Sequence, residues 1–257
     1  MEQKKPMELG LQLLKDINIV RHNEFRFINA EFGFVTSFSK METTIFSVGQ
    51  PYRLQEGRIA IVTNGSARVL INLIEYIFLP DHISLIAPNS IIQIIEVSHD
   101  FDAHMMAVDL NFLPISGKEE FFTHFLQQKK NLLFPLSTEE QIENFVTVMW
   151  SVLQEPVFRK EVIQHLLVGL LYNIEYIAKS KGQAELSPLT HQNDIFQRFI
   201  SLVNTYSKTE RNVSFYANKL CLTPRYLNTV IRQTSQQTVM DWINQSIILE
   251  AKVLLKH

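Results

Sequence analysis

The sequence has few of the residues that define disulfide-rich, metal-ribbon or collagen-like proteins. Its 257 residues include one cysteine, eight glycines and nine prolines. A lone Cys221 excludes an intramolecular disulfide framework and a cysteine-rich zinc site, and it fits a reducing compartment. Polar residues such as Asn89 and Glu175 interrupt the most apolar stretches, so no membrane span is expected. The N-terminal residues lack a signal-peptide pattern, and we therefore expect a cytoplasmic protein.

Patterns that carry catalysis are also scarce. The glycines form no phosphate-binding loop, and no arrangement of serine, histidine and aspartate suggests a catalytic triad. A metal-binding cupin needs a His-x-His pair, a carboxylate and a later histidine, and the chain has no His-x-His. The candidate ligands are His82, His99, His104, Asp100, Asp102 and Asp109. Their spacing does not assemble a three-ligand site, so we expect no enzyme, no metal and no other cofactor.

What the chain does contain is a globular composition with an uneven distribution of charge. Hydrophobic residues make up 46% of the chain and charged residues 19%, a normal balance for a globular protein. The length of 257 residues suits two domains. Residues 192–257 contain eight Lys or Arg and four Asp or Glu, a formal charge of +4, whereas the rest of the chain carries −6. A basic C-terminal segment on an acidic body is a modest indication of nucleic-acid binding.

Residues from about 24 to 112 have the pattern of short β-strands. Two runs of alternating residues between Arg58 and Asn72 flank Asn64-Gly65. Asn-Gly in this setting predicts a β-hairpin with a type I′ turn, because that turn requires positive φ at both central residues. Further strands are predicted at 31–36, 44–48, 75–79, 83–87, 91–97 and 104–110. Many short strands at this spacing are typical of a β-sandwich or small barrel.

At about residue 116 the apolar residues begin to recur every three to four positions. This period predicts helices at 118–128, 138–154 and 160–181. The last of them is apolar around most of its circumference, so it needs partners on two sides. One partner is the β domain, and the other is either a second copy of the chain or the same monomer. Residues 181–191 are polar and form the predicted linker, and helical periodicity resumes at Ile195.

Residues 213–234 predict a helix-turn-helix, the layout that places a second helix in the DNA major groove. Ser214 is the expected cap of a first helix at 215–220, and Cys221 and Leu222 form the turn. Thr223 is the expected cap of a second helix, which begins at Pro224, where a missing N–H has no cost, and runs to about Thr234.

The two faces of that second helix differ in chemistry. Leu227, Val230 and Ile231 share one face and are expected to pack on the first helix. The opposite face has no acid, and its side chains match base edges in the major groove. The expected DNA-contacting residues are Thr223, Arg225, Tyr226, Asn228, Thr229 and Arg232. An ordinary helical hairpin with a solvated polar face is the alternative from geometry alone.

The segment from Phe199 to Leu255 resembles the first half of the DNA-binding domain of arabinose-regulator (AraC-type) transcription factors. The matching residues are Val213-Ser214-Phe215-Tyr216-Ala217, Leu220, Leu222-Thr223-Pro224, Tyr226-Leu227, Val230-Ile231, Trp242-Ile243, Ile248, Glu250-Ala251-Lys252 and Leu254-Leu255. The family implies two helix-turn-helix units joined by a long helix. Thr238 is the expected cap of the joining helix, with Asp241 three residues later. Gln236 stands where the family often has a glycine that closes the recognition helix.

The resemblance extends, more weakly, to the upstream β region and its following helices, which are similar to the family's cupin-like sensing domain. The sequence ends before a second helix-turn-helix, so we expect a DNA-binding domain truncated after its first unit. One unit contacts few phosphates, and tight DNA binding is therefore expected only from a dimer. Polar anchors for an effector among the phenylalanine-rich strands are Tyr52, Arg53, Asn72 and Tyr76.

These observations predict an α+β protein. Its expected parts are a cupin-like β-sandwich or barrel that senses a ligand at 1–115, a helical dimerisation segment at 116–181, a linker at 182–191 and a partial helix-turn-helix domain at 192–257. The expected function is a sequence-specific transcriptional regulator that responds to a small-molecule effector and binds double-stranded DNA as a homodimer. The alternatives are a metal-dependent cupin-fold enzyme and a protein-interaction module that does not bind DNA.

Overall fold

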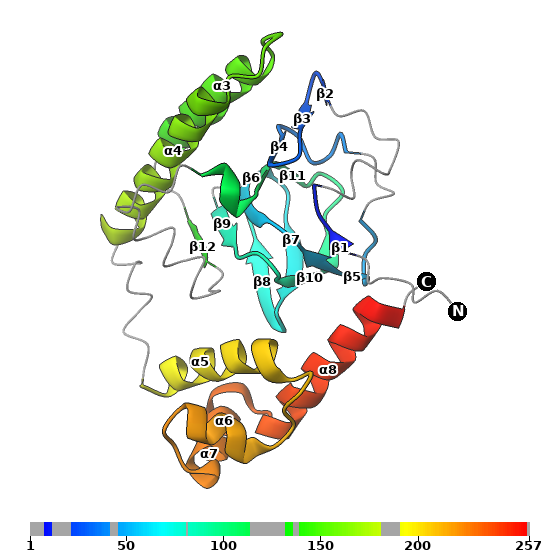
Figure 1. Cartoon of the computed structure of the whole chain (residues 1–257), viewed down its shortest axis with the longest axis vertical. Coiled ribbons are helices and arrows are strands. Elements are labelled where there is room, and N and C mark those ends of the chain that lie inside the picture. Colours follow the sequence, from blue (N-terminus) through cyan, green and yellow to red (C-terminus); the bar gives the residue numbers. More distant parts are fainter. Residues whose placement is uncertain are drawn as a thin grey trace. The chain divides into compact units, whose positions relative to one another are not determined.

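The chain places its strands before most of its helices (Figure 1). The structure is a computed structural model that describes residues 8–11, 22–41, 46–80, 82–113, 132–135, 139–180 and 191–255. These residues form two compact units. The larger unit contains the strands together with helices α3 (Glu139–Leu153) and α4 (Lys160–Ser180). The smaller unit is helical, so the predicted α+β class is confirmed.

The larger unit is a β-sandwich of two sheets. The first sheet has the order β1-β5-β10-β7-β8, and the second has the order β12-β9-β6-β11-β4-β3-β2. The strands are β1 (Glu8–Leu9), β2 (His22–Asn23), β3 (Arg26–Ile28), β4 (Phe32–Val35), β5 (Pro51–Leu54), β6 (Gly57–Asn64), β7 (Ala67–Ile71), β8 (Ile74–Phe78), β9 (His82–Ile86), β10 (Ile91–Val97), β11 (Asp102–Val108) and β12 (Leu132–Pro135). β1 pairs with β5 in parallel, whereas β10 is antiparallel to both of its neighbours.

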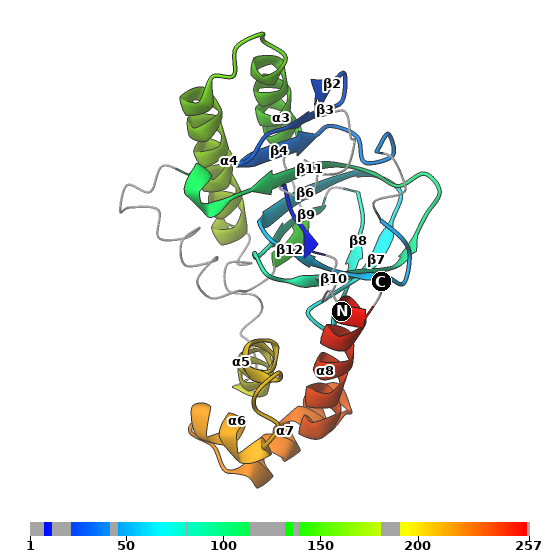
Figure 2. The same cartoon turned by 45° about the vertical axis from the view of Figure 1, so that its right-hand side comes forward.

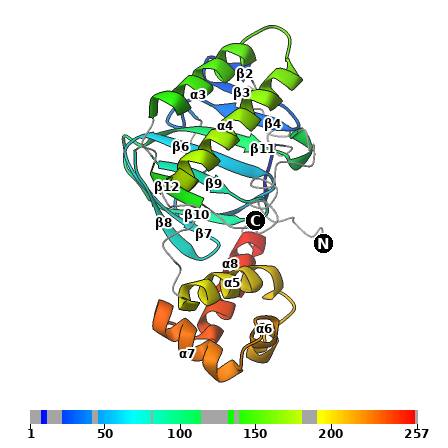
Figure 3. The ribbon, with the colours of Figure 1, turned by 90° about the vertical axis from the view of Figure 1, so that its left-hand side faces the viewer.

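The second sheet is buried on both faces. Along β6, Ile59 and Ile61 belong to the apolar core shared with α3 and α4, whereas Val62 belongs to the core between the sheets. Alternation along the strand produces this division, because successive side chains point to opposite faces. Figures 2 and 3 show the two helices lying across this sheet. Phe34 packs edge-on against Trp150 of α3, with ring centroids 5.8 Å apart.

The predicted hairpin at Asn64-Gly65 is wrong. β6 and β7 lie in different sheets, so the connection between them crosses the sandwich. Gly65 has a φ of 67°, and a Cβ there would lie 2.6 Å from backbone atoms of Phe101. The glycine therefore serves a close backbone approach. Positive φ at two successive residues occurs instead at Asn72 (49°) and Leu73 (73°), between the neighbouring strands β7 and β8.

Other strand and helix predictions can be compared directly. β4, β8, β9, β10 and β11 confirm the strands predicted at 31–36, 75–79, 83–87, 91–97 and 104–110, and α3 and α4 confirm helices at 138–154 and 160–181. Residues 46–48 are not a strand, so the prediction at 44–48 fails there, and 44–45 lie outside the described residues. The predicted helix at 118–128 and nearly all of the predicted linker also lie outside them. No helix within the described ranges is long and apolar enough to cross a membrane.

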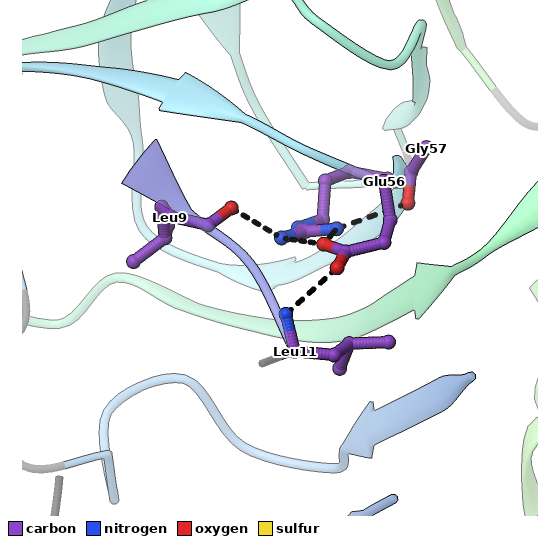
Figure 4. A network of polar contacts seen from close by, with 5 residues as sticks. Leu9, Leu11, Glu56 and Gly57 are labelled. Atoms are coloured by element: carbon purple, nitrogen blue, oxygen red, sulfur yellow. Dashed lines mark hydrogen bonds and ion pairs between the residues drawn. The ribbon is translucent and has the colours of Figure 1, made fainter. Parts of the chain in front are cut away.

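A buried ion pair holds the N-terminal strand against the sandwich (Figure 4). Glu56, which is 5% exposed, accepts a hydrogen bond from Leu11 N at 2.8 Å. Its other carboxylate oxygen lies 3.0 Å from the Arg58 guanidinium, which also donates to Leu9 O at 3.1 Å. Burial lowers the pKa of Arg58 from its usual value, and the Glu56 carboxylate acts in the opposite direction. Two backbone groups of the N-terminal segment are thus satisfied by one charged pair.

Candidate nucleic-acid interface

The smaller unit contains the candidate DNA-contacting residues. Its helices are α5 (His191–Tyr206), α6 (Val213–Lys219), α7 (Pro224–Ser235) and α8 (Val239–Leu255). Phe199 of α5 packs edge-on against Tyr216 of α6, with ring centroids 5.8 Å apart. Burial raises the pKa of Tyr216 to about 12, and its hydroxyl donates to Glu210 O at 2.7 Å. These contacts fix α6 on α5.

The first helix of the motif begins earlier than the sequence pattern indicated. Asn212 is its N-cap, and its side chain accepts a hydrogen bond from Ser214 N at 2.9 Å. The prediction that Ser214 caps the helix is therefore wrong, although asparagine is as good a cap as serine. After α6, Cys221 has a φ of 57°, and Leu222 N donates to Ala217 O at 2.9 Å. This short turn leads into α7, so the helix-turn-helix layout is confirmed.

The start of α7 agrees with the prediction. Thr223 has extended backbone angles, and its hydroxyl accepts a hydrogen bond from Tyr226 N at 3.2 Å, with Pro224 at the first helical position. The inner face contains Leu227, Val230 and Ile231, each at most 1% exposed. The predicted apolar face is thus confirmed.

The opposite face of α7 is exposed. Arg225, Tyr226, Thr229 and Arg232 are all exposed, and Tyr226 keeps 43% of its accessible surface. The Thr229 hydroxyl donates to Arg225 O at 3.0 Å, as threonine often does within helices. The helix has two arginines and no acid, so its exposed face carries a net positive charge. Guanidinium groups suit both phosphates and the O6 and N7 atoms of guanine.

Asn228 is placed differently from the rest of the candidate set. Its side chain is half-buried, with Nδ2 donating to Pro224 O at 3.2 Å and Oδ1 accepting from Val239 N at 3.4 Å. Both ends of the amide are therefore engaged inside the protein. This position connects α7 to the first residue of α8.

Two glutamines at the end of α7 were not among the residues predicted to contact DNA. Gln233 and Gln236 are both exposed, and Gln233 Oε1 accepts a hydrogen bond from Gln192 at 3.1 Å. Gln233 lies four residues after Thr229 on α7, a spacing that places it beside a predicted contact residue, whereas Gln236 has left the helical conformation. The i+4 spacing was the signal that would have placed Gln233 on the predicted face.

The junction between α7 and α8 is defined by local hydrogen bonds. Gln236 has a left-handed φ of 59° and closes α7 by donating to Arg232 O at 2.9 Å, as a non-glycine cap can. Thr238 caps α8, because its hydroxyl accepts from Asp241 N at 3.2 Å while Asp241 accepts from Thr238 N at 2.8 Å. The hydrogen bonds from the Thr238 side chain and backbone lower the pKa of Asp241.

Trp242 of α8 connects the junction between α7 and α8 to helix α5. Its Nε1 donates to Ser235 Oγ at 2.9 Å, and its ring packs edge-on against Phe196, with centroids 5.4 Å apart. The exposed face of α7 is thus held on a rigid support of three other helices.

The candidate metal ligands either form hydrogen bonds with other groups or are exposed to solvent. His99 is 98% exposed, with its ring 3.9 Å from Asp100. His104 lies 2.6 Å from Thr36 O and 3.3 Å from Glu143. Within the part of the chain that the structure describes, no three His, Cys, Asp or Glu side chains are grouped to hold a metal. Asp102 binds Ser37 and Ser39, Asp109 caps the short helix Leu110–Phe112, and His82 contacts Pro80 O.

Of the four proposed effector anchors, Tyr52 and Tyr76 belong to the same apolar core cluster, whereas Arg53 does not. Tyr52 is buried and its hydroxyl accepts from Ser47 N at 2.8 Å. Arg53 follows it on β5, so its side chain points to the opposite face and donates to Asn89 O at 3.1 Å. Burial raises the pKa of Tyr76 to about 12, and Asn72 lies in the turn before β8.

The fold and the exposed helix together define a β-sandwich protein with a separate helix-turn-helix unit. Among solved structures, the chain is similar to ToxT from Vibrio cholerae strain SCE256 with a bound unsaturated fatty acid, at 14% identity over 87% of this chain and 97% of that one, with a TM-score of 0.35. It is also similar to the AraC-like transcriptional activator CuxR, at 10% identity over 86% and 73%, with a TM-score of 0.34. Scores this low carry no argument about function. No protein-family model matches the sequence, and no curated protein matches it.

Proposed function

We propose that the chain is a transcriptional regulator of the AraC type that reads the major groove of DNA with α7. The observation that carries the proposal is the division of this helix into a buried apolar face and an exposed, acid-free face with Arg225 and Arg232. The tight turn at Cys221 and the caps at Thr223 and Thr238 support it, because they hold α7 at a surface. A groove-reading helix needs a rigid mount and a cationic outer face.

Within this proposal most of the candidate residues contact DNA directly, and one of them positions the helix. Arg225, Thr229 and Arg232 contact base edges or phosphates, and Tyr226 at the edge of the face contacts the backbone. Thr223 presents the start of the helix to DNA. Asn228 belongs to the same surface but acts by positioning α7 on α8, since its amide is already bonded at both ends.

The proposal includes three wider features that the sequence predicted. The chain acts as a homodimer, because pairing two copies doubles the number of phosphates and half-sites that the α7 helices contact. A small-molecule effector changes its DNA affinity by binding two arrangements of the protein unequally. The chain acts without enzymatic chemistry, as a cytoplasmic regulator.

The experiment uses a pool of random DNA duplexes from which the wild-type chain selects its preferred sequence. The double variant Arg225→Ala and Arg232→Ala is expected to keep the wild-type circular dichroism spectrum and lose at least about tenfold in affinity for the selected duplex, since each bidentate contact contributes roughly 1–3 kcal/mol. Arg159→Ala is the matched control, because this arginine is 50% exposed and lies in the other unit, between α3 and α4.

The dependence of binding on salt separates phosphate contacts from base contacts. Losing one phosphate contact lowers the slope of log affinity against log salt by about 0.9, whereas losing a base contact relaxes sequence preference. Wild-type affinity in the double variant, or failure of the wild type to select any sequence, would contradict the proposal and favour a protein-interaction module.

A further inference from the structure

Hydrogen bonds inside the smaller unit decide which donors and acceptors the exposed face of α7 offers to DNA. Arg225 and Arg232 are both exposed on this face. A guanidinium carries only N–H groups and no acceptor, so these two side chains can donate hydrogen bonds but cannot accept them. The two strongest hydrogen-bonding groups of the face are therefore donors.

The polar residues between the two arginines have already used groups that would read adenine or donate to a base. The half-buried Asn228 donates from Nδ2 to Pro224 O at 3.2 Å and accepts at Oδ1 from Val239 N at 3.4 Å. An amide that reads adenine needs both of these groups, one for N7 and one for N6. The Thr229 hydroxyl donates its single proton to Arg225 O at 3.0 Å, so it presents only an oxygen and a methyl group.

Gln233 is the other amide on the exposed face, and it is bonded through its oxygen. Its Oε1 accepts a hydrogen bond at 3.1 Å from Nε2 of Gln192, which lies in the first turn of α5. This bond directs the amide oxygen towards α5 and leaves the two N–H groups on the other side of the amide. Hydrogen bonding at the oxygen also polarises the amide and strengthens its N–H groups as donors. Gln192 therefore sets Gln233 as a donor.

A face that mainly donates is complementary to guanine. In the major groove guanine presents two acceptors, N7 and O6, whereas adenine pairs its N7 acceptor with an amino donor and cytosine presents only an amino donor. A donor placed against an amino group leaves both without a partner, and this costs free energy. From Arg225 to Gln233 the face is about 12 Å long, which corresponds to about three to four base pairs.

We propose that the DNA segment read by α7 is rich in guanine, and that Gln192 is a positioning residue that makes Gln233 select guanine over adenine. The inference rests on the proposed function and adds to it the chemical class of base that α7 recognises. Gln233 donates to the guanine beside it, and Gln192 acts through Gln233 without touching the base.

The first experiment locates the base pair that Gln233 reads. The full wild-type chain selects its preferred sequence from random duplexes, and each guanine of that sequence is then replaced by 7-deazaguanine, which pairs normally with cytosine but lacks the N7 acceptor. Replacement of a guanine that α7 contacts is expected to lower wild-type affinity at least about fivefold, the lower limit for one good base contact. At one of these positions Gln233→Ala is expected to show no further loss on replacement, which identifies its base pair.

Three substitutions of Gln192 then separate a positioning role from a merely structural one. Gln192→Lys keeps a donor for Gln233 Oε1 and is expected to retain guanine at that base pair. Gln192→Ala removes the hydrogen bond, so the amide can turn, and adenine is expected to bind within about twofold of guanine. Gln192→Glu offers only acceptors to Gln233, whose oxygen is then expected to face DNA, and the preference is expected to move to adenine or cytosine, which carry amino donors.

Gln245→Ala is the matched control. Gln245 Nε2 donates to Gln237 Oε1 at 2.9 Å, so this variant removes a second glutamine pair close to the end of α7 without involving Gln233. It is expected to keep the wild-type base preference. Circular dichroism of every variant is expected to match that of the wild type.

The outcomes separate this inference from the DNA-binding proposal. Absence of guanine at the base pairs whose preference depends on Arg225 or Arg232 would overturn the inference and leave DNA binding intact. The same holds for an unchanged preference in Gln192→Ala and Gln192→Glu, for an even loss of affinity across all base pairs in these variants, and for an equal change in Gln245→Ala. Failure of the wild type to select any sequence would overturn both proposals.

Discussion

Asn228 Oδ1 accepts a hydrogen bond from Val239 N, so a side chain of the candidate recognition helix satisfies the first backbone N–H of the following helix. The same amide donates to Pro224 O at 3.2 Å. Two helices are therefore tied through one side chain, whose position on the helix would otherwise suit a base contact. The distinction between these roles can be measured.

Replacement of Asn228 by alanine is expected to weaken DNA binding evenly across sequences. The reason is that α7 loses a tie to α8, with a cost of about 1 kcal/mol in stability for the lost hydrogen bonds. The measurement is selection from random duplexes together with urea unfolding. A preference that relaxes at one base pair only, with unchanged stability, would instead show that Asn228 reads a base directly.

Replacement of Gln236 by glycine is expected to stabilise the smaller unit by roughly 0.5–1 kcal/mol, because its left-handed φ of 59° carries no steric cost for glycine. Gln233→Gly is the matched control, since Gln233 lies inside α7, where glycine is expected to destabilise by about 1 kcal/mol. Thermal unfolding followed by circular dichroism measures both. Shifts of the same sign in the two variants would show that the backbone at Gln236 is not strained.

The cap of α8 is expected to contribute to acid unfolding. The hydrogen bonds from Thr238 lower the pKa of Asp241 in the folded state, so the charged carboxylate stabilises the fold above its unfolded pKa of about 3.9. That contribution is lost as the pH falls through the lower, folded value. Asp241→Asn is therefore expected to show a shallower loss of stability below about pH 4, measured by urea unfolding.

A pair of threonine variants controls for the source of that effect. Thr238→Ser keeps the hydroxyl that donates to Asp241 at 2.7 Å and is expected to retain the wild-type pH profile. Thr238→Val removes the hydroxyl and is expected to resemble Asp241→Asn. Equal profiles for all three variants would exclude the cap as the titrating element.

The buried ion pair of the sandwich is expected to be far more sensitive than an exposed one. Glu56→Gln removes the charge that faces Arg58, and it is expected to cost about 3 kcal/mol, because it leaves a buried guanidinium without its counter-charge. Glu75→Gln is the matched control, since Glu75 is 46% exposed beside Arg68, and its expected cost is below about 1 kcal/mol. Similar costs, measured by urea unfolding, would show that the Glu56 pair is not effectively buried.

Features that depend on a few neighbouring residues were predictable from the sequence. The Thr223 cap, the Pro224 start and the inner face of α7 follow from local hydrogen bonding and the helical period, and all of them are present. The first helix was placed two residues late because Asn212 and Ser214 are equivalent as caps by chemistry. In the structure Asn212 is the cap, and Ser214 lies inside the first turn of α6.

Features that depend on distant segments were not predictable. Asn64-Gly65 has the local signature of a hairpin. However, β6 pairs with β9 and β11 in one sheet, whereas β7 belongs to the other sheet. The position of Asn228 was missed for a similar reason, because its partner at Val239 belongs to the next helix. Spacing along one helix shows which side chains share a face, but it does not show which neighbour will engage them.

Strand β6 supplies apolar side chains both to the core under α3 and α4 and to the core between the two sheets. A shift in its register would therefore disturb both cores. An insertion of one residue within Gly57–Asn64 would exchange Ile59 and Ile61 with Ala60 and Val62. Ala60 and Val62 would then face the helices, and the larger Ile59 and Ile61 would enter the core between the sheets. Length changes in this strand should accordingly be tolerated far less than polar replacements at the loops beside it.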